Sequence, residues 1–147
     1  HKLGIDEERI VVPHKFRPDD TETPKFLKLK ADVEHSNCIL FDDEILTGNT
    51  GLDTIGQLDQ LGAAGIYSAA THFIASNGAA ERFQDSPLTQ LITTDTIPYM
   101  GTLPSKVKVA SVAPLLARAI RRIHDGRSVG RLIDELEEKA LRGERLF

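Results

Sequence analysis

The chain has 147 residues, and its 18 Lys and Arg against 22 Asp and Glu give a formal net charge of −4 at pH 7. Its 40% hydrophobic and 27% charged residues match ordinary globular usage, which predicts one folded domain with a buried core, so the chain need not be disordered. A mildly acidic chain is not expected to bind nucleic acid, and no apolar run approaches the roughly 20 residues of a membrane span.

The single cysteine, Cys38, cannot form an internal disulfide and lies in the apolar run Cys38–Phe41. These features predict a buried free thiol and a reducing, cytoplasmic location. The chain begins at His1, and Lys2-Leu3-Gly4 resembles the last turn of a helix whose body would precede it. We therefore expect residues 1–147 to be the C-terminal domain of a longer protein, with an N-terminal half absent.

The first predicted elements are a short strand and a long polar loop. Ile10-Val11-Val12 favours a strand that ends at Pro13. Residues 14–30 then form a polar loop whose basic residues are Lys15, Arg17, Lys25, Lys28 and Lys30. Long loops in compact domains are often functional lids, although the composition fits a solvated excursion equally well.

From residue 38 onward, apolar runs alternate with helical patterns, which predicts an α/β fold with a mainly parallel sheet flanked by helices. Cys38–Phe41 is apolar without alternation, so it is predicted to be the central strand, covered on both faces. Asp42–Gly51 is predicted to be a loop. Further strands are expected at 66–70, 91–94 and 107–111, and helices at 52–61, 76–83, 115–123 and 129–147.

The loop Asp42–Gly51 carries the strongest candidate chemistry. A loop between a buried strand and a helix directs backbone N–H groups and a helix N-terminus toward one point, which is a ready anion site. Thr47 and Thr50 add hydroxyl donors, and Gly48 permits close approach of a phosphate. Asp42 and Asp43 suit a sugar diol or a hydrated Mg²⁺. The same residues also suit ordinary turn and helix capping, so the residues alone leave both interpretations open.

A resemblance to a known family narrows these alternatives. The run CILFDDEILTGNT resembles the 5-phosphoribosyl 1-pyrophosphate (PRPP) binding motif of type I phosphoribosyltransferases. The stretches ATHFIASNGAAERFQDSPLTQLITTDTIP and VASVAPLLARAIRRIHDGRSV are similar to the C-terminal half of the ribose-phosphate pyrophosphokinase (PRPP synthetase) family. The resemblance covers about residues 3 to 134.

The resemblance implies a phosphoribosyltransferase-type fold and an enzyme that transfers pyrophosphate from Mg-ATP to ribose 5-phosphate, giving PRPP and AMP. It also implies Mg²⁺ as cofactor and a homo-oligomer, with the adenine site in the N-terminal half and a neighbouring subunit.

The resemblance further implies roles for particular residues. Asp42 and Asp43 would hold the ribose hydroxyls and could meet the metal indirectly. Lys15 and Arg17 would match a Lys-x-Arg on a loop that closes over ATP. The 5-phosphate would lie in a cradle formed by Thr47, Gly48, Asn49 and Thr50.

Two positions depart from the family pattern, in which an apolar residue usually stands at Glu44 and an aspartate at Leu46. One alternative is therefore a non-catalytic PRPP-synthetase-like partner subunit. Another is a nucleobase phosphoribosyltransferase that consumes PRPP.

His72 follows a predicted strand and could lie at the edge of the site. We expect it to be a hydrogen-bonded structural residue rather than a catalytic one.

Overall fold

The computed structural model describes residues 10, 15–16, 25–26 and 32–144. The chain divides into two compact units, one formed by Val12–Ala110 and the other by His1–Val11 with Ser111–Phe147. We call the first the sheet unit and the second the helical unit. No helix within the described ranges has the length and apolar character that crossing a membrane requires.

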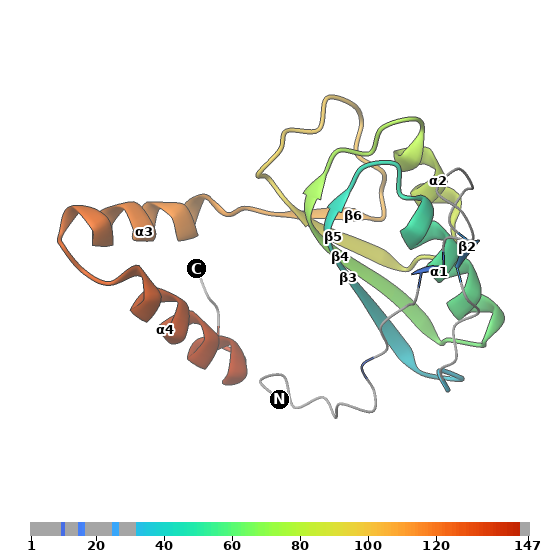
Figure 1. Cartoon of the computed structure of the whole chain (residues 1–147), viewed down its shortest axis with the longest axis horizontal. Coiled ribbons are helices and arrows are strands. Elements are labelled where there is room, and N and C mark those ends of the chain that lie inside the picture. The colour runs from blue at the N-terminus through green and yellow to red at the C-terminus, as the bar shows by residue number, and fades with distance from the viewer. Residues whose placement is uncertain (1–9, 11–14, 17–24, 27–31, 145–147) are drawn as a thin grey trace. The chain divides into compact units, whose positions relative to one another are not determined.

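The sheet unit is built on a four-stranded parallel sheet with the order β3-β4-β5-β6 (Figure 1). This arrangement confirms the predicted α/β class. Because all the strands run in the same direction, their carboxyl ends meet at one edge, where ligands of open α/β sheets bind. The strands are β3 (Asn37–Ile45), β4 (Gly65–Phe73), β5 (Gln90–Thr94) and β6 (Val107–Ala110).

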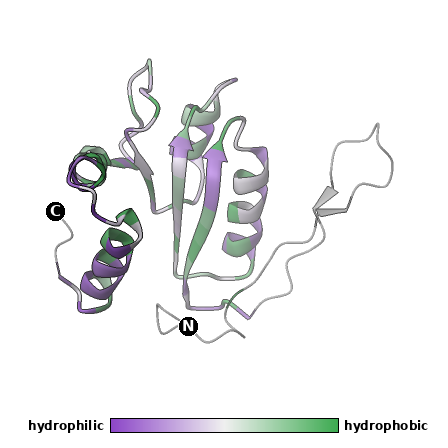
Figure 2. Ribbon diagram, turned by 60° about the vertical axis from the view of Figure 1, so that its left-hand side comes forward, coloured by the Kyte–Doolittle hydropathy of each residue, from purple (hydrophilic) through white to green (hydrophobic). Residues whose placement is uncertain are grey.

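Two helices, α1 (Asn49–Gln60) and α2 (Ala79–Asp85), pack on one face of this sheet. The predicted helices at 52–61 and 76–83 are thereby confirmed, with α2 beginning at Ala79. The apolar side chains that α1 and α2 contribute meet those of the strands in one core. Figure 2 marks the hydrophobic residues of the ribbon in green. The least exposed large side chains of this core are Phe73, Phe83, Ile55, Leu88 and Leu91.

The prediction that Cys38–Phe41 forms a central strand covered on both faces is wrong for the described sheet. β3 lies at its edge, beside β4 alone. Ile39 and Phe41 are 57% and 71% exposed, because α1 and α2 cover the opposite face. Cys38 lies on the covered side but is half-buried rather than buried, and this partial burial raises the pKa of its thiol.

The boundary between strand and loop also differs from the prediction. Asp42–Ile45 was expected to belong to the loop, yet β3 continues to Ile45. The pairing with β4 explains the extension, because Glu44 lies opposite His72 and Ile45 opposite Phe73. The buried side chain of Ile45 anchors this end of the strand in the core. The loop before α1 therefore shrinks to residues 46–48.

The helical unit contains α3 (Ala113–His124) and α4 (Val129–Leu141). The predicted helices at 115–123 and 129–147 are thereby confirmed, although α4 ends at Leu141. Pro114 lies in the first turn of α3, where a missing N–H costs nothing. Ser128 caps α4 by accepting a hydrogen bond from the N–H of Arg131. Arg122 joins the helices through an ion pair with Glu135, in which Nη2 donates to both carboxylate oxygens at 2.8 and 2.6 Å.

Only fragments of the predicted polar loop are described. Lys15-Phe16 (β1) pairs antiparallel with Lys25-Phe26 (β2). Lys15 thus lies in a short strand, and Arg17 lies outside the described residues. Most of the predicted strand at residues 10–12 also lies outside them.

Two isoleucines test whether α1 and α2 cover one face of the sheet and leave the opposite face of the sheet unit exposed. Ile66 in β4 is 2% exposed and Ile39 in β3 is 57% exposed. We expect Ile66→Ala to lower the free energy of unfolding by about 2 to 5 kcal/mol, because it leaves a cavity in the core. The same change at Ile39 should cost less than about 1 kcal/mol. Denaturant titration measures both losses, and equal losses would contradict the described packing.

Candidate functional site

The carboxyl end of β3 carries three consecutive acidic residues, Asp42, Asp43 and Glu44, all exposed. The N–H of Asp43 donates to Asp42 Oδ1 at 3.0 Å, and the N–H of Glu44 donates to Asp43 Oδ1 at 2.9 Å. Each aspartate therefore orients itself on the backbone of the residue that follows. The strand end presents fixed carboxylates rather than freely rotating ones.

The pKa of Asp43 is held below its usual value by its surroundings. The main cause is a side-chain hydrogen bond with Asp42, followed by the backbone N–H groups and then by the charge of His72. A carboxyl group with a lowered pKa stays ionised at neutral pH and acts as an acceptor. His72 itself is half-buried, and its Nδ1 lies 2.8 Å from Thr96 Oγ1. This hydrogen bond agrees with the structural role expected for His72. Because His72 lies opposite Glu44 in the sheet, it is also at the edge of the site.

Gly48 turns the chain from the loop into α1. Its φ of 70° lies in the left-handed region, and it occupies the N-cap position of α1. Glycine has no side chain with which to cap the helix, and the first N–H groups of a helix have no intrahelical partner. Thr47 and Thr50 are half-buried beside this turn, and Asn49 is exposed. The turn therefore offers the donors and the helix-dipole field of an anion site.

Phe83 of α2 lies directly beneath this turn. A Cβ added to Gly48 would collide with Phe83 Cε2, and one added to Gly51 would lie 3.4 Å from Phe83 Cζ. Phe83 is 1% exposed and makes an edge contact with Phe73, with the ring centroids 6.5 Å apart. The backbone of the loop thus rests on a fixed aromatic side chain of the core.

Two further side chains hold the loop and were missed by sequence reasoning. Ser76 Oγ donates to the Leu46 carbonyl at 3.1 Å. Arg82 donates to the Thr47 carbonyl at 2.6 Å and to Asn49 Oδ1 at 2.7 Å. These residues stand about 30 or more positions along the chain from their partners, so no local spacing could have indicated them.

The structure brings one group of the predicted site residues together at the carboxyl end of β3 and the start of α1. Lys15 lies in β1, where its side chain is not described, and Arg17 lies outside the described residues. The group gathered at the strand end is Asp42, Asp43, Thr47, Gly48, Asn49 and Thr50.

Within the described residues, no group of three or more His, Cys, Asp and Glu side chains is arranged to hold a metal ion. A dedicated all-protein cage is therefore not found in that part of the chain. Mg²⁺, however, is commonly held by one or two carboxylates together with water and substrate phosphates. The adjacent carboxylates of Asp42 and Asp43 fit this second mode, since Asp43 stays ionised.

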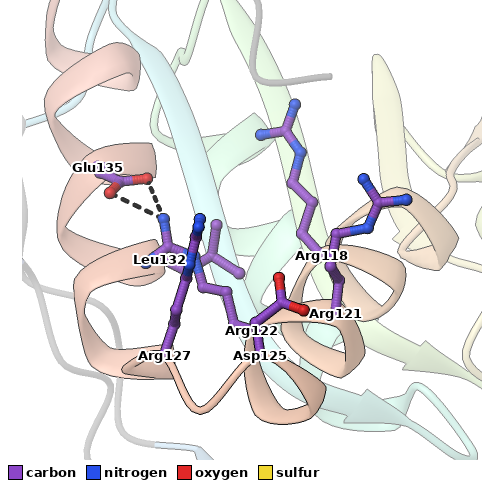
Figure 3. Close-up of a pocket in the computed structure, with 7 residues that line it drawn as sticks. All are labelled: Arg118, Arg121, Arg122, Asp125, Arg127, Leu132 and Glu135. Carbon is purple, nitrogen blue, oxygen red and sulfur yellow. Dashed lines mark hydrogen bonds and ion pairs between the residues drawn. The ribbon is translucent and has the colours of Figure 1, made fainter.

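A cavity of about 220 Å³ lies between the helices of the helical unit (Figure 3). None of the predicted site residues lines it. Arg121 and Arg122 belong to the last turn of α3, where positive charge is stabilised by the helix dipole, and Arg122 pairs with Glu135. Helix-end electrostatics and this ion pair account for the placement of Arg121 and Arg122. The cavity is lined by Arg118, Arg121, Arg122, Asp125, Arg127, Leu132 and Glu135.

A parallel α/β sheet that carries two aspartates at a strand end, followed by a Thr-Gly-x-Thr turn into a helix, defines a protein of the phosphoribosyltransferase-type fold. The chain belongs to the phosphoribosyl synthetase-associated domain family, whose model matches residues 7–134.

Relatives named ribose-phosphate pyrophosphokinase agree with this assignment. The chain is 40% identical over 124 residues to that of Caldanaerobacter subterraneus, covering 84% of this chain and 39% of the relative. It is 38% identical over 126 residues to that of Clostridium tetani, covering 85% and 39%. The chain thus spans about two fifths of the length of these curated relatives.

A solved structure supports the fold. The phosphoribosylpyrophosphate synthetase from Mycobacterium smegmatis matches with a TM-score of 0.63 and 33% sequence identity. The match covers 73% of this chain and 35% of that chain. The phosphoribosyltransferase-type fold implied by the sequence is therefore confirmed.

Two glycines, Gly48 and Gly56, test whether the turn before α1 requires a residue without a side chain. Gly48→Ala should lower the free energy of unfolding by about 2 kcal/mol or more, because a left-handed alanine is strained and its Cβ meets Phe83. Gly56, inside α1, has open space around its Cβ position, so Gly56→Ala should stabilise the protein by about 0.5 to 1 kcal/mol. Denaturant midpoints measure both, and a neutral Gly48→Ala would contradict the described turn.

Proposed function

We propose that this chain supplies the ribose 5-phosphate site of a ribose-phosphate pyrophosphokinase, which transfers pyrophosphate from Mg-ATP to ribose 5-phosphate and releases AMP. One observation carries the proposal: paired aspartates at the end of β3 lead directly into the donor-rich turn that opens α1. The names of the curated relatives support this activity over a nucleobase phosphoribosyltransferase.

The two halves of the substrate match the two halves of the site. Hydroxyl groups of ribose need acceptors, which Asp42 and Asp43 provide as carboxylates. The 5-phosphate needs donors, which come from the backbone N–H groups of Thr47, Gly48, Asn49 and Thr50 and from the threonine hydroxyls. Their order along the chain places acceptors and donors side by side.

The reaction in this proposal is an in-line displacement. The ribose 1-hydroxyl oxygen attacks the β-phosphorus of ATP and forms a bond to it, the bond between the β-phosphorus and the AMP oxygen breaks, and the hydroxyl proton is released to water. Negative charge is distributed over the transferring group, so fixed positive charge stabilises the transition state. Lys15 and Arg17 are proposed as the cations that arrive with loop closure.

Asp42 and Asp43 would hold Mg²⁺ through water when the substrate brings it. The ion supplies charge neutralisation on the phosphate oxygens. Residues of the chain itself bind and orient the sugar: the carboxylates fix the hydroxyl face, and the turn before α1 fixes the 5-phosphate. Together they hold the 1-hydroxyl in one position, which lowers the entropic part of the barrier.

The chain spans 39% of the length of its relatives, and we propose that the adenine site belongs to the remaining part and to a neighbouring subunit of a homo-oligomer. On this basis the 147-residue chain would bind ribose 5-phosphate without forming AMP by itself.

A non-catalytic partner subunit is kept as a second candidate because Glu44 and Leu46 depart from the family pattern. Glu44 adds an exposed carboxylate beside Asp43, which opposes phosphate binding unless a cation intervenes. Reverting these positions with Glu44→Ile and Leu46→Asp separates the candidates. Ribose 5-phosphate binding that appears only after reversion favours the non-catalytic subunit.

Calorimetric titration with ribose 5-phosphate in the presence of Mg²⁺ tests the proposal. We expect saturable binding by the natural chain and a loss of about tenfold or more in Thr47→Ala, since a charge-assisted hydrogen bond is removed. Ser36→Ala, before the amino-terminal end of β3, is the control and should bind like the natural chain. Equal affinity in all three proteins would refute the assignment of the 5-phosphate to this turn.

A further inference from the structure

Arg82 bridges both sides of the Gly48 turn. Its Nη2 donates to the carbonyl of Thr47 at 2.6 Å, and its Nη1 donates to Asn49 Oδ1 at 2.7 Å. Both distances are short, as expected for charge-assisted hydrogen bonds. The guanidinium therefore fixes the residue before the glycine and the residue after it, although it comes from a different helix.

Because a peptide unit is planar, a contact at its C=O also determines the direction in which its N–H points. The C=O and the following N–H of a trans peptide point in opposite directions. Because the carbonyl of Thr47 points toward Arg82, the N–H of Gly48 points away from it. Ser76 acts in the same way on the preceding peptide: its N–H and Oγ donate to the carbonyl of Leu46 at 2.8 and 3.1 Å. The N–H of Thr47 is thereby turned away from Ser76.

The consequence is a turn in which the carbonyls of Leu46 and Thr47 are occupied, while the N–H groups of Thr47 and Gly48 point away from the side chains that occupy them. Phe83 closes the space beneath Gly48, so the turn cannot collapse into the core. Without Arg82, the Thr47–Gly48 peptide could rotate and point its carbonyl oxygen toward the site. The partial negative charge of that oxygen would repel an anion. A donor set that is already oriented avoids that ordering cost when a ligand binds.

We propose that Arg82 is a positioning residue that orders the Thr47–Asn49 turn to receive the 5-phosphate of ribose 5-phosphate. The proposal rests on the function proposed above for this turn. Arg82 acts through the turn, and its guanidinium holds the backbone rather than the phosphate.

The first measurement is calorimetric titration with ribose 5-phosphate. Arg82→Ala should bind about tenfold more weakly or worse, since both anchoring bonds are lost. Arg82→Lys keeps the charge but not the two-pronged geometry, so its affinity should lie between the two. Lys108→Ala, an exposed cation of β6, is the matched control and should bind like the natural chain. Unchanged affinity in Arg82→Ala, or full affinity in Arg82→Lys, would overturn the proposal.

The second measurement needs no ligand. The N–H of Leu52 donates to the Gly48 carbonyl at 2.9 Å and closes the first turn of α1. In the ligand-free chain, Arg82→Ala should make the amide hydrogen of Leu52 exchange several-fold faster, while that of Leu58 in the core stays unchanged. If Arg82→Ala does not fold, the exchange rate of the Leu52 amide is measured in Arg82→Lys instead.

These two measurements separate the possible failures. If the natural chain does not bind ribose 5-phosphate but Leu52 exchange rises in the variant, the function proposed for the turn fails and the positioning role stands. If affinity falls while Leu52 exchange is unchanged, Arg82 acts directly on the ligand and the positioning role is overturned.

Discussion

The packing of Phe83 against Gly48 is the contact on which the site depends. It joins the hydrophobic core, in which Phe83 also meets Phe73, to the backbone of the turn before α1. The ring of Phe83 leaves no room for a Cβ at position 48, and the left-handed φ of Gly48 would strain any residue that has one. The stability of the core is thus transmitted to the turn that we propose binds the 5-phosphate.

Charge creates the second constraint. In the proposed function, a phosphosugar binds beside Asp42 and Asp43, in a chain of net charge −4. The compensation comes from oriented backbone N–H groups and the N-terminus of α1. Arg82 adds a guanidinium that holds the carbonyl oxygen of Thr47, and we propose that this keeps the oxygen away from the anion. The chain order keeps these opposite requirements together, because β3 carries the carboxylates near its end and leads into the turn within a few residues.

The sequence was sufficient to predict the helices and the strands β4, β5 and β6, but not where β3 ends or which strands are neighbours. Leu52, Ile55 and Leu58 recur at helical spacing, so α1 could be predicted. The edge position of β3 could not be, because an apolar run says nothing about which strands flank it. The extension of β3 through Asp42–Ile45 depends on pairing with β4, which overrides the poor strand preference of aspartate.

The same distinction applies to the site. The acidic pair and the Thr-Gly-x-Thr turn were recognisable because they are contiguous in the sequence. Arg82 and Phe83 of α2, and Ser76 of the segment between β4 and α2, support that turn through contacts that exist only once these segments have packed beside it. Long-range support of this kind has no local pattern to reveal it.

Residue-resolved amide chemical shifts during titration with ribose 5-phosphate test the central claim most directly. The account predicts saturable shifts concentrated in Thr47–Thr50, with the amides around the arginine-lined cavity of Figure 3 unaffected. Shifts concentrated at Arg121–Arg127, with the amides of Thr47–Thr50 unmoved, would show that the anion binds in the helical unit and would contradict the account.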